Sequence, residues 1–122
     1  MLSLPLPVRI FLCTRYADLR KSFDGLAQMV REFLGADPLS GHLFVFRNKR
    51  SDRIKLLYWD TDGLAIWYKR LEQGSFRFPA ATDAGIEIRA ADLTMLLDGV
   101  DLENVKRQRR YRRPTTTSGP TS

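Results

Sequence analysis

The chain has 122 residues, 43% hydrophobic and 28% charged, a composition typical of one ordinary globular domain. Its single cysteine, Cys13, excludes an internal disulfide framework, and together with the single histidine, His42, excludes the usual zinc-ligand sets. No hydrophobic run approaches the roughly 20 residues that span a bilayer, and two early prolines argue against a secretory signal, so we expect a cytoplasmic protein without membrane contact.

The formal net charge of +6 comes from one segment near the C-terminus. Six of the twenty Lys and Arg residues lie between positions 106 and 113. The other fourteen are balanced by fourteen Asp and Glu residues, all of which precede this segment. Residues 114–122 are rich in Thr, Ser, Gly and Pro, a composition typical of disorder. We therefore expect one neutral domain over residues 1–105 and a disordered, basic tail over residues 106–122.

The N-terminal third predicts a strand followed by a helix. Residues 8–13 alternate in a strand-like pattern. Asp18 has a side chain suited to a helix N-cap, and Gly35 followed by Pro38 is typical of a helix end. Between them, five hydrophobic residues recur at spacings of three and four, which predicts a helix of about four turns with one buried stripe. These residues are Leu19, Phe23, Leu26, Val30 and Phe33.

Three hydrophobic runs then follow, at 42–46, 54–59 and 64–68, each rich in aromatic and branched residues. Runs of this length and composition predict strands. The segment Asp60-Thr61-Asp62-Gly63 predicts a hairpin, because an Asp-Gly pair tolerates the positive φ of tight turns. We expect an antiparallel three-stranded meander at the centre of the fold.

The last part of the domain predicts a short strand at 86–88 and a second helix at 90–98. Leu93, Leu96 and Leu97 are expected to face the core, and Gly99 is expected to follow the helix end. The predicted fold class is α+β, a small antiparallel β-meander sheet packed against two helices that cover one face.

The stretch GHLFVFRNKRSDRIKLLYWD, followed by YKRLEQGSFRFP, resembles the TnpB-type accessory proteins of the bacterial insertion-sequence family number sixty-six. Upstream, DLRKSFDGLA is similar to the opening helix of that family, and the likeness covers residues 8–101. The resemblance implies a non-catalytic protein that assists DNA transposition, with the transposase and other accessory proteins of the same element as partners. The family's transposase activity belongs to a separate, larger protein, so we expect no cofactor.

Two basic segments are candidates for contact with DNA. Arginine on a hairpin loop can bind phosphate in bidentate fashion, and a basic arm binds nucleic acid through counterion release. Tyr111, inside the arm, can stack on an exposed base. The alternatives are a solvated loop and a solubilising tail. The candidate residues are Arg47, Lys49, Arg50, Arg53 and Lys55 in the loop region and Lys106, Arg107, Arg109, Arg110, Arg112 and Arg113 in the tail.

The sequence offers little for catalysis. Asp60 and Asp62 flank a turn, where aspartate usually serves turn geometry, and two-metal phosphoryl transfer needs carboxylates that converge on ions about 4 Å apart. The sequence contains no glycine-rich phosphate loop and no G-x-S-x-G motif. A nuclease is therefore the weakest of the hypotheses.

The leading hypothesis is DNA binding within a transposase complex. The alternative is a protein–protein adaptor that never touches DNA and that uses exposed aromatic residues of the meander as interface anchors. Aromatic residues on a sheet more often belong to the core or cover one of its faces. The rings concerned are Tyr58, Trp59, Trp67 and Tyr68. The sequence leaves the oligomeric state open.

Overall fold

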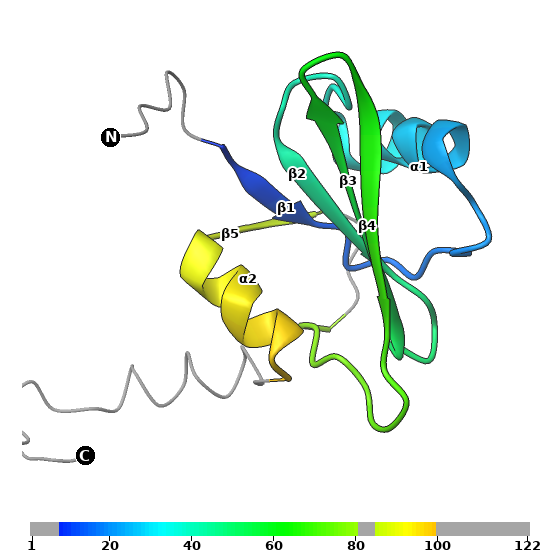
Figure 1. Ribbon diagram of the computed structural model, residues 1–122, viewed down its shortest axis with the longest axis vertical. Helices are drawn as coiled ribbons and strands as arrows, with labels where there is room; N and C mark the ends of the chain where they lie inside the picture. The colour runs from blue at the N-terminus through cyan, green and yellow to red at the C-terminus, as the bar shows by residue number, and fades with distance from the viewer. Residues whose placement is uncertain (1–7, 81–84, 100–122) are drawn as a thin grey trace, which may run out of the picture.

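A computed structural model describes residues 8–80 and 85–99, which form a five-stranded sheet with two helices (Figure 1). The predicted α+β class is confirmed. The predicted disordered tail lies outside the described residues. The strands are β1 (Ile10–Leu12), β2 (Leu43–Arg47), β3 (Arg53–Asp60), β4 (Gly63–Arg70) and β5 (Ile86–Ile88), and the helices are α1 (Phe23–Met29), continued by the π-helical turn η1 (Val30–Leu34), and α2 (Ala90–Leu97).

The strand order in the sheet is β4-β3-β2-β1-β5. β2, β3 and β4 are antiparallel neighbours, so the predicted meander is confirmed. β1 runs parallel to β2, because α1 forms the crossover between them, and β5 pairs antiparallel with the other side of β1. The two short strands β1 and β5 therefore extend the meander beyond β2, and β4 forms the opposite edge of the sheet.

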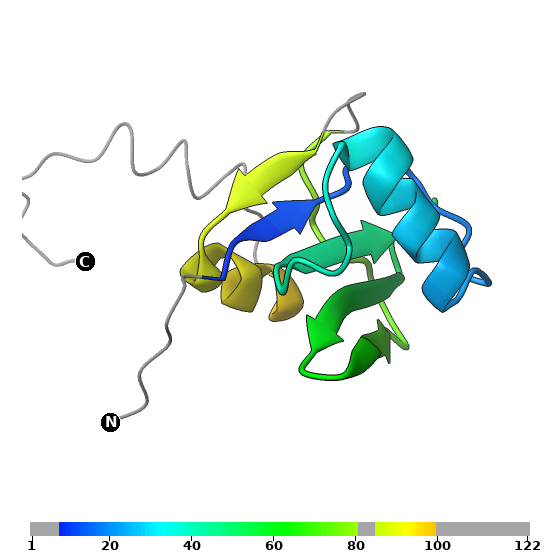
Figure 2. The ribbon, with the colours of Figure 1, turned by 90° about the horizontal axis from the view of Figure 1, so that it is seen from above.

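The core is divided between the two faces of the sheet. On one face, Phe44 and Leu57 pack with Leu26 of α1. On the other face, Val45 and Leu56 pack with Leu96 of α2. The helices thus lie on opposite faces (Figure 2), and the prediction that both cover one face is wrong. β2 and the middle of β3 carry hydrophobic residues on both faces, and such strands need cover on both.

The first helix begins later than predicted. Asp18 is not its N-cap, because the helix starts at Phe23 after Ser22. The Asp18 carboxylate instead accepts a hydrogen bond from the Arg20 backbone N–H (3.0 Å), closing a turn of the kind that aspartate side chains favour. Leu19 is nevertheless buried against the α1 side of the sheet, whereas Phe23 is 43% exposed. The regular hydrophobic spacing therefore spans a turn and a helix, and Leu19 and Leu26 reach the same core although only Leu26 is helical.

The β3–β4 hairpin has the predicted position, with Asp60 paired to Gly63. The residue with positive φ is Thr61 (55°), and Gly63 is not in the left-handed region. The Asp62 N–H donates to the Asp60 carbonyl across Thr61. The positive φ therefore occurs at Thr61, two residues before Gly63, where the sequence predicted it.

Replacing Gly35 by alanine is expected to lower the free energy of unfolding by about 1 kcal/mol. Gly35 ends η1 with φ 59°, and an added Cβ would meet no atom within 4 Å, so the cost is conformational. Gly63→Ala is the matched control, because that site is equally open and its φ is not left-handed. Urea denaturation should show the loss only for Gly35→Ala, and equal losses would contradict this account.

Candidate nucleic-acid interface

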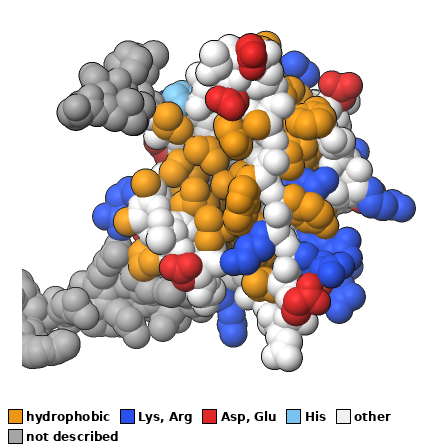
Figure 3. Space-filling model, in the orientation of Figure 1, with side chains coloured by type: hydrophobic (Ala, Val, Ile, Leu, Met, Phe, Trp, Pro, Cys, Tyr) orange, Lys and Arg blue, Asp and Glu red, His pale blue; other side chains and the backbone are white. Residues whose placement is uncertain are grey.

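Basic side chains from three parts of the chain meet at one end of the sheet. The antiparallel register places Arg53, at the start of β3, opposite Arg70, at the end of β4, and Ile54 opposite Lys69. The β2–β3 loop leads into this end. In Figure 3, lysine and arginine side chains lie on both sides of the lower half of β4, with the largest group on its right. We call these exposed residues the basic end: Lys49, Arg50, Arg53, Lys69, Arg70 and Arg77.

The β2–β3 loop is held by one asparagine. The Asn48 Oδ1 accepts the Arg53 backbone N–H (3.1 Å), and its Nδ2 donates to the Asp52 carboxylate (2.6 Å). The bond from Asn48, together with the charges of Arg50 and Arg53, lowers the pKa of Asp52. The single acid of the loop is therefore engaged by Asn48, while the side chains of Lys49 and Arg50 are exposed. The hydrogen bonds of Asn48 therefore fix the conformation of the loop, and the loop exposes two cationic side chains.

Arg53 and Arg70 face each other across two strands on the same side of the sheet. Like charges directly opposite one another are destabilising, and an anion that binds both would relieve this repulsion by Coulomb attraction. Arg70 also pairs with Glu72 (3.1 Å), a contact between exposed side chains. Lys55 lies farther along this face, where its Nζ donates to the Lys21 carbonyl (3.0 Å) and sits 4.9 Å from the Tyr68 ring centroid.

Arg47, one of the sequence candidates, is buried and is not part of the basic end. It is only 5% exposed, and its Nη2 donates to the Thr14 carbonyl (2.7 Å). Its guanidinium lies 4.6 Å from the Tyr16 ring centroid and 4.7 Å from that of Phe78. Burial lowers the pKa of the Arg47 side chain. Arg47 therefore joins the segment after β1 to the segment after β4 from inside the molecule.

The signal that Arg47 differs from its neighbours was present in the strand alternation. Leu43, Val45 and Arg47 are alternate residues of β2 and share the α2 face of the sheet. The signal for Lys69 and Arg70 was the hairpin, since a two-residue turn at 61–62 fixes Arg53 opposite Arg70. The six tail candidates lie outside the described residues.

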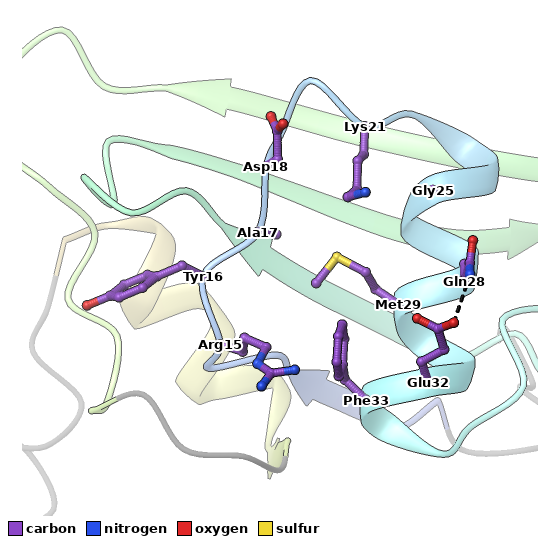
Figure 4. Close-up of a pocket in the computed structure, with 10 residues that line it drawn as sticks. All are labelled: Arg15, Tyr16, Ala17, Asp18, Lys21, Gly25, Gln28, Met29, Glu32 and Phe33. Carbon is purple, nitrogen blue, oxygen red and sulfur yellow. Dashed lines mark hydrogen bonds between the residues drawn. The ribbon is translucent and has the colours of Figure 1, made fainter.

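A separate cavity of about 310 Å³ lies between α1 and the segment after β1 (Figure 4). Several of its polar side chains are engaged with one another or with a ring, since Gln28 donates to Glu32 (2.8 Å) and Arg15 lies 4.2 Å from the Phe33 ring centroid. Arg20 holds the pKa of Asp18 at about 2. The side chains that line this cavity include no serine, cysteine or histidine.

The cysteine, the histidine and the two turn aspartates are spread across the fold. Burial raises the pKa of the Cys13 thiol, and the His42 Nδ1 accepts the Arg9 backbone N–H (3.0 Å). Asp60 and Asp62 are exposed at the hairpin turn. In residues 8–80 and 85–99, no three His, Cys, Asp or Glu side chains are grouped to hold a metal ion. Neither helix in these ranges has the length and hydrophobicity of a membrane span.

The aromatic residues of the meander differ in exposure. Tyr58 and Trp59 are partly buried, whereas Trp67 and Tyr68 on β4 are 41% and 48% exposed. Trp67 borders an apolar groove of about 420 Å³ on the α2 face, visible in Figure 3 as the hydrophobic area between α2 and β4. The other lining residues are Leu43, Leu56, Tyr58 and Leu97.

The fold and the basic end define a small α+β protein with a cationic surface at one end of its sheet. Residues 8–107 match the family described as IS66 Orf2 like protein, and the chain belongs to this family of insertion-sequence accessory proteins. The resemblance read from the sequence is confirmed. It extends beyond its expected end at Asp101 and includes Lys106 and Arg107, the first two basic residues of the tail.

Two relatives from Sinorhizobium fredii (strain NBRC 101917 / NGR234) match nearly the whole chain. The uncharacterized protein y4jC is 39% identical over 108 residues, which cover 88% of this chain and 92% of the relative. The uncharacterized protein y4hO is 37% identical over 114 residues, which cover 93% and 91%. No solved structure matches the chain.

Proposed function

We propose that this protein is a non-catalytic accessory factor that assists transposition of its insertion sequence in the cytoplasm by binding DNA. It acts in a complex with the transposase and the other accessory proteins of the element. Membership of the family supports a role in transposition, and the basic end is the observation that supports DNA binding as the mechanism. An exposed arginine pair held face to face by the sheet register is well suited to bridge phosphates.

The charge distribution also supports an orientation on DNA. Asp60 and Asp62 lie at the turn of the β3–β4 hairpin, while Arg53 and Arg70 lie at its open end. The eight residues of β4 separate the two ends by about 26 Å, at roughly 3.3 Å per residue. A domain without formal net charge therefore approaches the duplex with its basic end, and binding depends on phosphates rather than on base edges.

The test is duplex DNA binding by fluorescence anisotropy across a salt series. Replacing both Lys49 and Arg50 by glutamine is expected to make the log–log salt slope shallower by about 2, because two phosphate contacts are lost. The matched control replaces Arg9 and Arg31 by glutamine. This substitution changes the net charge by the same amount, and both residues lie outside the basic end. The control should keep the slope of the natural chain.

Equal slopes for the loop variant and the control variant would refute the basic end as the contact surface. A chain that binds no duplex near physiological salt would refute DNA binding altogether. The second candidate function, a transposase adaptor without DNA contact, would then be favoured. The exposed Trp67 and Tyr68 support that alternative, because aromatic residues often anchor protein interfaces.

A further inference from the structure

β4 is an open edge of the sheet in the part of the chain that the structure describes. The Leu71 N–H, which follows β4, donates to the Asp52 carbonyl (2.7 Å), so odd-numbered residues of this strand direct their N–H groups toward β3. In an antiparallel ladder this direction alternates. The N–H and carbonyl groups of Leu64, Ile66 and Tyr68 therefore point away from the sheet.

This edge lacks the usual protection against pairing. Exposed edge strands are normally kept short or interrupted by proline, a bulge or charged residues. β4 instead pairs with β3 over its full eight residues without a bulge, and its middle reads Leu64-Ala65-Ile66-Trp67-Tyr68. The charges flank this stretch: Asp60, the last residue of β3, and Asp62 in the turn precede β4, and Lys69 and Arg70 end it.

We propose that β4 pairs antiparallel with β4 of a second copy of this chain, giving a two-fold dimer with one continuous sheet. Antiparallel pairing brings the acidic end of each strand to the basic end of the other. The β3–β4 hairpin therefore carries both halves of the charge complementarity, and the complementary partner is a second copy of the chain.

The register centred on Ile66 satisfies the backbone and the side chains together. With Ile66 opposite Ile66 of the second copy, Leu64 lies opposite Tyr68, and these pairs join the outward N–H and carbonyl groups of both strands. Trp67 then faces the small Ala65, and Arg70 faces Asp62, so in the dimer Arg70 is paired with a carboxylate and the phosphate contacts of the basic end fall to its other cations. Moving the register by two residues toward the C-terminus places Asp62 opposite Glu72, a like-charge pair that is destabilising.

The groove beside Trp67 adds apolar area to this contact. Trp67 points to the α2 face, where it borders Leu56 and Leu97. In the proposed register the Trp67 rings of the two copies are diagonal neighbours, with Cα atoms about 7–8 Å apart. Each ring is within reach of the other copy, so pairing would cover indoles that are 41% exposed in the single chain.

The test measures oligomeric state by light scattering after size exclusion, without DNA, so that its result is independent of DNA binding. The natural chain is expected at twice the mass of one chain when loaded at roughly 100 µM, where a micromolar contact is populated. Asp62→Arg alone and Arg70→Asp alone each create two like-charge pairs, and each should run as a monomer. Mixing the two variants restores both opposite-charge pairs, so the mixture should form a heterodimer.

A monomeric natural chain at this concentration would overturn the proposal. Dimers that persist in both single variants would overturn it as well, because the contact would then lie elsewhere. Failure of the mixture to recover the dimer mass would exclude the Arg70–Asp62 register. Both positions are exposed, so the comparison does not depend on a change in the core.

Discussion

Replacing the six basic residues of the tail by glutamine is expected to make the log–log salt slope of duplex DNA binding shallower by about 5. The tail supplies the whole net charge, because fourteen basic and fourteen acidic residues balance in the rest of the chain. Each phosphate contact contributes about 0.9 to the slope. The residues replaced are Lys106, Arg107, Arg109, Arg110, Arg112 and Arg113.

The control for this variant is a chain that lacks residues 114–122, which carry no charged side chain. It shortens the tail but keeps all six cations, so its slope should equal that of the natural chain. An unchanged slope in the glutamine variant would show that the tail does not touch DNA. Preference for element-end sequence over scrambled sequence, if it survives in the glutamine variant, would assign that preference to residues 1–105.

Arg47→Ala is expected to lower the free energy of unfolding by about 3 kcal/mol, in the range for loss of a buried polar contact together with packing. The substitution removes the donor to the Thr14 carbonyl and the flat group between the Tyr16 and Phe78 rings. Stacking of this kind adds about 1–2 kcal/mol when it is shielded from water. Urea denaturation, monitored by tryptophan fluorescence, measures the loss.

Arg47→Met separates the two contributions, because methionine keeps much of the aliphatic stem but donates no hydrogen bond. We expect an intermediate loss of stability and an unchanged salt slope for DNA binding. Arg50→Ala is the surface control and should stay within about 0.5 kcal/mol of the natural chain. A loss that small for Arg47→Ala would contradict its structural role, and a shallower salt slope for Arg47→Met would return Arg47 to the DNA interface.

The elements that local sequence predicts well are those defined by short-range chemistry. The hydrophobic runs of β2, β3 and β4, the αL residue Gly35 and the α2 stripe depend on neighbours a few residues away. The start of α1 was predicted wrongly, because Asp18 and Leu19 satisfy the same rules within a turn. The prediction that both helices cover one face was wrong, because β2 carries hydrophobic residues on both faces and each face needs a cover.

The sequence by itself determined the family, the meander and the basic tail, since these follow from residue identity, turn chemistry and summed charge. Only the tertiary structure decided which arginines face water. Arg47 and Arg53 are six positions apart in one basic stretch, yet strand alternation buries the first and the hairpin register sets the second opposite Arg70. Whether a charged side chain lies inside or outside depends on contacts between distant segments, and composition does not contain that information.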